Sequence, residues 1–107
     1  MSVERHGVDL PEAAGTAWRA YCAMLSSKDA HFGYLETLNT KYERGGNRTL
    51  AEGARLQQLL AEHDRCVTAF TAEMRALKAA DAAAHGQLVA AIGELNRSLG
   101  ATPGAAN

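Results

Sequence analysis

The stretch LQQLLAEHDRCVTAFTAEMRALKAADAAAHGQLVAAIGEL, residues 56–95, decides the fold, because apolar side chains return in it every third or fourth position. Among its heptad positions, only His63 and Asp81 are strongly polar. A stripe with this period buries against another helix rather than against a sheet. The sequence therefore predicts an all-α protein built from helix contacts. Counted from Val67, the seam positions are Leu56, Leu60, His63, Val67, Phe70, Met74, Leu77, Asp81, Ala84, Leu88, Ala91 and Leu95.

A second apolar stripe precedes this stretch and predicts a partner helix in the same chain. Asp9 and Glu12 have the spacing of a capping box, and Pro11 is tolerated in a first helical turn. The stripe lapses at residues 26–29, which is where a kink would fall. Tyr34 is the aromatic residue that lies off the stripe. The apolar positions are Ala14, Trp18, Tyr21, Leu25, Phe32, Leu35, Leu38 and Tyr42.

The segment between the two stripes has the composition of a tight turn. Gly45 and Gly46 suit a left-handed helix end, and Thr49 with Glu52 forms a second capping-box signal. We therefore expect one helical domain over residues 9–99, between a flexible N-terminus at 1–8 and a disordered tail at 100–107. Its parts are a helix at about 10–43, a turn at 44–48 and a helix at about 49–99.

The second predicted helix is longer than the first, at about 75 Å against about 50 Å, so it overhangs or breaks. Residues 78–86 are its weakest part, because Asp81 replaces a core residue and Gly86 costs about 1 kcal/mol of helix stability. The alanines at 79–84 favour helix. A continuous or gently bent helix is the preferred interpretation, and a break there would give three helices.

These elements predict an antiparallel helical hairpin with long, coiled-coil-like helices. A single hairpin has a thin core, because each helix offers only one stripe. We therefore expect a homodimer in which two hairpins form a four-helix bundle.

Composition excludes several classes of protein. The net charge of -1 argues against general nucleic-acid binding, which needs a clustered positive field. No apolar run approaches the roughly 20 residues that cross a bilayer, so no membrane partner is expected. The N-terminus lacks the apolar core of a signal peptide, which predicts a cytoplasmic protein. Cys22 and Cys66 do not make a disulfide framework and are expected to be small buried thiols.

Candidate chemistry is sparse. His63 and Cys66 lie one turn apart and would suit a shared metal, but no second Cys/His pair supports them, so a hydrogen-bonded seam histidine is favoured. Asp81 and His85 are open to three readings, namely a polar seam position that fixes register, solvent exposure, or chemistry. The segment 44–48 resembles either an anion nest or a plain helix-helix turn with solvated arginines. With no nucleophile–base pair and no Glu-x-x-His motif, we expect no catalytic residues, metal site or cofactor.

Charge becomes thin after Lys78, where Asp81, Glu94 and Arg97 are the remaining charged residues. A solvated helix face normally carries more charge than this. The face either packs within a homodimer, binds another protein, or is simply an exposed alanine-rich surface. We expect partner binding there, at Leu88, Ile92, Leu95 and Leu99.

The segment AEMRALKAADAAAHGQLVAAIGELNRSLG, residues 72–100, resembles the later helices of bacterial flagellar export chaperones in its leucine and alanine spacing. That resemblance implies a small cytoplasmic helical protein that shields a client helix. The predicted function is a non-enzymatic helical interaction module, with a secretion-type chaperone or adaptor as its specific form. Two alternatives stay open: a metal or redox sensor that uses His63 and Cys66, and a dimeric regulator of nucleic acid or a regulatory protein, with a patch of Arg44, Arg48, Arg55 and Arg65.

Overall fold

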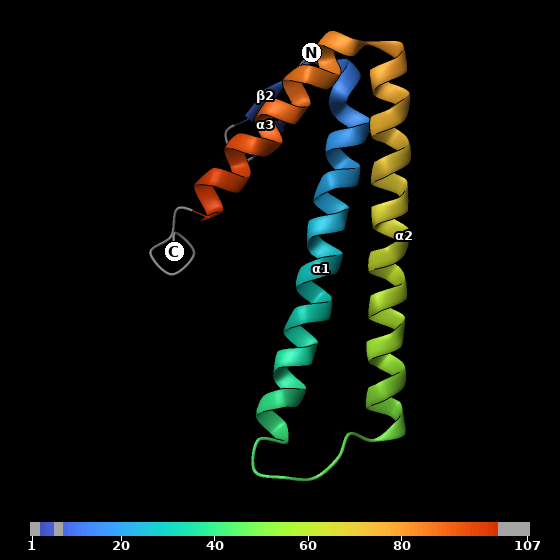
Figure 1. Cartoon of the computed structure of the whole chain (residues 1–107), viewed down its shortest axis with the longest axis vertical. Coiled ribbons are helices and arrows are strands. Elements are labelled where there is room, and N and C mark those ends of the chain that lie inside the picture. The colour runs from blue at the N-terminus through green and yellow to red at the C-terminus, as the bar shows by residue number, and fades with distance from the viewer. Residues whose placement is uncertain (1–2, 6–7, 101–107) are drawn as a thin grey trace. The chain divides into compact units, whose positions relative to one another are not determined.

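The computed structural model describes residues 3–5 and 8–100, with the side chains of residues 10–98. Three helices hold most of these residues, which confirms the all-α prediction (Figure 1). Of the predicted tail at 100–107, Gly100 is the last residue of α3, and 101–107 lie outside the described residues. The elements are β1 (Val3–Arg5), β2 (Val8–Leu10), the 3-10 turn η1 (Glu12–Ala14), α1 (Gly15–Lys41), α2 (Leu50–Ala80) and α3 (Ala82–Gly100).

The N-terminal boundary of the first helix was predicted wrongly. Asp9 does not cap a helix but lies in β2, where it pairs with Glu4 of β1 in an antiparallel ribbon. Pro11 is extended, with φ -57° and ψ 147°, and a residue that precedes proline is itself biased toward extended backbone. The chain therefore turns through η1 and becomes α-helical only at Gly15. The described part of the predicted flexible segment 1–8 is accordingly strand.

The second predicted helix is two helices. α2 ends at Ala80 and α3 begins at Ala82, within the weak stretch 78–86, so the preferred continuous or gently bent helix is wrong and the alternative of three helices is confirmed. The Asp81 carboxylate accepts a hydrogen bond from the Ala84 backbone N–H at 3.0 Å. Because this bond satisfies an amide in the first turn of α3, Asp81 acts as its N-cap and helps to end α2.

The chain groups into two compact units. Unit 1 comprises the described residues of 1–18 and 73–107, and unit 2 comprises residues 19–72. In unit 1, α3 packs against β2 and η1 (Figure 1). Both the ribbon and α3 thereby contribute to one apolar core, whose buried residues are Leu10, Ala14, Ala17, Trp18, Leu77, Ala84 and Leu88.

Unit 2 consists of two helical segments and the turn between them. Lys41 at the end of α1 contacts Glu52 at the start of α2, and Tyr21 contacts Phe70, so the segments run in opposite directions, as the ribbon in Figure 1 shows. The aromatic rings of Tyr21 and Phe70 have centroids 5.4 Å apart, and Ser27 hydrogen-bonds His63. Its buried side chains are Tyr21, Ser27, Leu38, Leu56 and Leu59.

The seam of α2 differs from the predicted one at Leu60 and Val67, which are exposed. Leu56 and Leu77 are buried as predicted, but Leu59 takes the place of Leu60. The side chain of Leu59 is 9% exposed and that of Leu60 is 39% exposed. Both leucines satisfy a helical period, and only the rotation of α2 against α1 decides which one is buried.

α1 is continuous through residues 26–29, where a kink was considered. The lapse in its stripe is filled by Ser27, which is buried. Two further expectations on α1 are wrong: Phe32 was expected in the core and is exposed, whereas Tyr34 was expected off the stripe and is half-buried. The neighbouring residue His31 is half-buried in place of Phe32.

Candidate functional site

The polar residue at the centre of the predicted seam has a polar partner. The Ser27 hydroxyl donates to the Met24 carbonyl oxygen at 2.8 Å and lies 3.0 Å from His63 Nδ1. Because the Ser27 proton is committed to Met24, the arrangement fits a His63 tautomer that donates from Nδ1 to the Ser27 oxygen. The hydrogen-bonded interpretation of His63 is confirmed, and its partner lies at the lapse in the α1 stripe, which the sequence did not predict.

Unit 2 exposes large apolar side chains beside this seam. Phe32 is 54% exposed, and Leu60 and Val67 are 39% and 38% exposed. The His31 ring packs against the Phe32 ring edge to face, with centroids 5.5 Å apart. Single exposed apolar residues are ordinary, and a set that shares one surface is not. The positions of Phe32, Leu60 and Val67 around the two helices therefore decide whether they form one surface.

The geometry of the two helices places them on one side of unit 2. Phe32 lies about 140° around α1 from Ser27, and Leu60 and Val67 lie about 60° and 40° around α2 from His63. Because the segments run in opposite directions, these rotations lead to the same side of the helix pair. By the helical rise, Phe32 and Leu60 also lie within about 3 Å of the same level.

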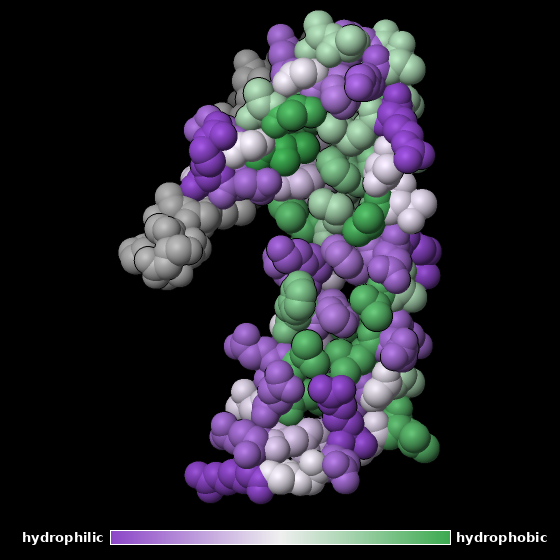
Figure 2. All heavy atoms as spheres, viewed as in Figure 1, coloured by the Kyte–Doolittle hydropathy of each residue, from purple (hydrophilic) through white to green (hydrophobic). Residues whose placement is uncertain are grey.

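We name the surface formed by Phe32, Leu60 and Val67 the Phe32 face. Figure 2 shows one side of unit 2, on which hydrophobic residues gather along the line between α1 and α2, with hydrophilic residues on both flanks. Such a surface suits contact with another apolar surface, since it combines exposed apolar area with a polar rim. Sequence reasoning missed it, because Leu60, Val67 and Phe32 were all assigned to the core.

The predicted partner-binding residues of α3 have a different setting. Leu88 is fully buried in unit 1, so it cannot meet a partner without opening that unit, and its assignment is corrected. Ile92 and Leu95 are half-buried, while Val89, which was not singled out, is 48% exposed. The side chain of Leu99 lies outside the described residues. The low charge of α3 is thus explained in part by its packing on β2 and η1, which the sequence did not predict.

The predicted polar seam position Asp81 is exposed and serves as the cap of α3. The His85 backbone N–H donates to the Asp81 carbonyl oxygen at 3.0 Å, which is an ordinary first-turn helical bond. The structure agrees with solvent exposure of Asp81 and adds a role that the three interpretations did not include, the capping of α3. This role accounts for the polar residue at position 81.

The candidate metal pair is not supported by a third ligand. Among the described residues, no three His, Cys, Asp or Glu side chains come close enough to hold a metal ion. The Cys66 thiol lies 3.6 Å from a carboxylate oxygen of Glu62, which also pairs with Arg65. The Arg65 hydrogen bond and charge hold the pKa of the Glu62 carboxyl below its usual range. Cys22 and Cys66 are both free thiols and half-buried rather than buried.

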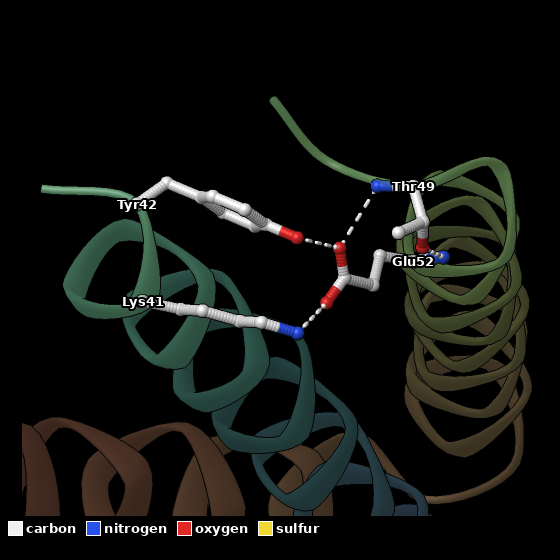
Figure 3. A network of polar contacts seen from close by, with 4 residues as sticks. All are labelled: Lys41, Tyr42, Thr49 and Glu52. Atoms are coloured by element: carbon white, nitrogen blue, oxygen red, sulfur yellow. Dashed lines mark hydrogen bonds and ion pairs between the residues drawn. The ribbon is translucent and has the colours of Figure 1, made fainter. Parts of the chain in front are cut away.

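The turn between α1 and α2 is organised around one carboxylate (Figure 3). Glu52 accepts hydrogen bonds from the Tyr42 hydroxyl at 2.5 Å and the Thr49 backbone N–H at 2.9 Å, and pairs with Lys41 Nζ at 2.7 Å. In return, the Glu52 backbone N–H donates to the Thr49 hydroxyl at 3.0 Å. The predicted capping box is therefore confirmed, and two residues from the end of α1 have been added to it.

These contacts shift the ionisation of the groups involved. The hydrogen bond from Lys41, followed by those from Thr49 and Tyr42, lowers the pKa of the Glu52 carboxyl to about 2. The same hydrogen bond to Glu52 raises the pKa of Lys41, and the bond from the Tyr42 hydroxyl raises the pKa of Tyr42. Each donor thus loses its proton less readily, because that proton bonds to a carboxylate.

The arrangement of the turn bears on the anion-nest interpretation. Gly45 and Gly46 have φ of 114° and 94°, as the predicted left-handed turn requires. A pocket of about 350 Å³ is lined by residues of the turn that include Tyr42, Gly46 and Arg48. However, the Glu52 carboxylate already occupies the N-terminus of α2, and a bound anion there would meet like charge. The plain-turn interpretation fits the structure better.

Comparison with protein-family models, with curated proteins and with solved structures gives no match for this chain. The resemblance to flagellar export chaperones therefore stays a prediction. Within residues 3–5 and 8–100, no helix combines the length and the apolarity that a bilayer span requires.

Proposed function

We propose that this chain is a non-enzymatic helical module for protein–protein interaction. The observation that supports the proposal is the Phe32 face, where three large apolar side chains remain exposed on one side of unit 2. Burial of apolar area is the main driving force of protein association, and two antiparallel helices offer a ready platform for a third helix. In its specific form the module is a secretion-type chaperone or adaptor that acts in the cytoplasm.

A homodimer of hairpins that forms a four-helix bundle remains the predicted assembly. If that dimer uses the Phe32 face, it buries the same apolar residues, so the same variants test self-association as well as binding of another protein. A dimeric regulator that binds nucleic acid or a regulatory protein is a second proposal. Its support is narrower: Arg44, Arg48 and Arg55 of the arginine patch are exposed, but the fourth member, Arg65, pairs with Glu62. Duplex DNA binding that weakens steeply with salt would favour it.

The test of the proposed function compares two variants of the whole chain. The first carries Phe32→Ser and Val67→Ser on the Phe32 face. The second carries Leu50→Ser, which alters a more exposed leucine, 95% exposed, at the start of α2. Circular dichroism first establishes that both variants keep their helices. Sedimentation velocity then measures self-association, and affinity capture with quantitative mass spectrometry measures binding of other proteins.

We expect an association of either kind that the Phe32 and Val67 substitutions remove and the Leu50 substitution leaves in place. If the wild type and both variants associate equally, or if none of them associates, the result would count against an interaction module that uses this face.

A further inference from the structure

The Phe32 face has an acidic rim. Lys28, Asp29 and Glu36 lie one turn from Phe32 along α1, and Asp64 lies one turn from both Leu60 and Val67 along α2. All four charged side chains are exposed. Among the ion pairs of the described residues, none includes any of the four. One positive and three negative charges therefore lie one helical turn from the apolar residues.

This rim is more acidic than the chain as a whole, whose net charge is -1. Two other basic residues of unit 2 are already neutralised by carboxylates outside the rim: Lys41 pairs with Glu52 at the turn, and Arg65 pairs with Glu62. A partner that covers the Phe32 face would therefore approach Asp29, Glu36 and Asp64 while meeting Lys28 as the single cation. Charge around an interface selects partners and sets association rates more than it adds affinity.

The rim also discriminates between occupants. In a two-fold symmetric dimer the same patch meets itself, so this face would bring six carboxylates and two ammonium groups together. Like charges placed opposite each other across an interface oppose association. A second copy is thus a poor match for this particular face, whereas a surface of opposite charge is a good one.

We propose that the Phe32 face binds an amphipathic helix of another protein whose apolar stripe is flanked by lysine or arginine. The inference rests on the proposed function and gives it a partner chemistry. Phe32 from α1 and Leu60 and Val67 from α2 contact the apolar stripe, as a third helix does when it packs across a helix pair. Asp29, Glu36 and Asp64 face the basic flanks.

The test uses two synthetic helical peptides that differ only in the sign of charge. One carries leucine at 3.6-residue spacing with lysine on its flanks and alanine elsewhere, and the other has glutamate in place of each lysine. Each peptide is labelled with a fluorophore, and its anisotropy is measured against the whole chain at about 0.1 M and about 1 M salt.

Two matched pairs of variants locate the binding. Phe32→Ala removes the exposed ring of the face, and Leu50→Ala removes an exposed leucine ten residues before Leu60, about 15 Å away along α2. Asp64→Lys reverses a rim charge, and Glu43→Lys makes the same change in net charge at the turn. All four positions are exposed, so folding should survive each substitution.

We expect the lysine peptide to bind about tenfold more tightly than the glutamate peptide at the lower salt, with the difference shrinking at the higher salt. Phe32→Ala should weaken binding about tenfold and Leu50→Ala should not. Asp64→Lys should narrow the preference between the peptides several-fold more than Glu43→Lys does.

Equal binding of both peptides, with loss in Phe32→Ala, would overturn the basic-partner inference and leave the interaction module standing. Self-association that Phe32→Ala abolishes, with no peptide binding, would likewise overturn it in favour of a second copy. Absence of both peptide binding and self-association would overturn the inference and the proposed function together.

Discussion

At the scale of single residues, two polar contacts join α1 to α2 within unit 2. The Glu52 carboxylate bonds Lys41 and Tyr42 at the turn, and Ser27 bonds His63 further along. Each contact fills a place where apolar packing lapses or ends. A polar residue in a helical seam is tolerated when its partner is supplied, and leaving one member without its partner is costly.

The Glu52 carboxylate should make stability depend on pH. Its pKa in the folded chain is about 2, below the ordinary value of 4.5, so the unfolded chain binds more protons between these limits. Its contribution is fully present above about pH 4.5 and is lost as the pH falls toward 2. Chemical denaturation of the wild type and of Glu52→Gln across this range should show a steeper slope in the wild type than in the variant, where Glu62, whose pKa is also lowered, still contributes.

The control for this titration is Glu43→Gln, an exposed carboxylate in the same turn. It should retain the wild-type slope. If Glu52→Gln keeps that slope as well, the network in Figure 3 does not govern acid stability.

Residue-level prediction from the sequence succeeded where a local rule applies. Thr49, Glu52, Gly45 and Gly46 were assigned because capping boxes and left-handed turns depend on neighbours in sequence. The Tyr42 and Lys41 contacts to Glu52 depend on how α1 ends above the turn, and no local pattern specifies that. The pairing of Ser27 with His63 needed the register between two helices, which the sequence left open.

At the scale of helices, the choice of seam residues created the Phe32 face. The heptad pattern supports either Leu59 or Leu60 beside Leu56, since both lie within one apolar arc. The structure buries Leu59 and turns Leu60 outward, together with Val67. The same ambiguity on α1 turned Phe32 outward. The candidate site was therefore unpredictable from periodicity alone, because it consists of the residues that the rotation of the helices excludes.

This rotation predicts unequal effects of one substitution at adjacent positions. Leu59→Ala should lower the free energy of unfolding by about 2–3 kcal/mol, because it leaves a cavity in the seam. Leu60→Ala should lower it by about 1 kcal/mol or less, because its side chain is already partly solvated. Urea denaturation of both variants measures the difference, and a larger loss for Leu60 would reverse the assignment of the seam.

At the scale of the whole molecule, the chain forms two compact units with separate cores. Unit 1 joins segments from the two ends of the described chain, since β2, η1 and α3 contribute to one core around Trp18 and Leu88. The sequence predicted helical structure for this unit, but it did not predict that α3 is a separate helix packed on the ribbon. Strands of three residues carry too little periodicity to be recognised, and Pro11 was interpreted as a helix start.

Leu88 should therefore behave as a core residue and not as a contact for partners. Leu88→Ala should cost about 3 kcal/mol of stability and shift the fluorescence of the buried Trp18, the single tryptophan, to longer wavelength. Val89→Ala is the matched control at the adjacent, 48% exposed position, and it should change neither quantity appreciably. If Leu88→Ala lowers stability but leaves the Trp18 fluorescence spectrum unchanged, Trp18 does not belong to the core around Leu88.

The order of the side-chain contacts along the two helices of unit 2 has a kinetic consequence. Tyr42 and Glu52 are ten residues apart in the chain, Ser27 and His63 thirty-six, and closure of a short loop costs less entropy than closure of a long one. Folding of this unit should thus begin with the contacts at the turn, and the contacts farther from the turn should form later. Thr49→Ala would then slow folding, whereas Phe70→Leu, at the far end, would mainly speed unfolding, and stopped-flow chevrons for the two variants distinguish these effects.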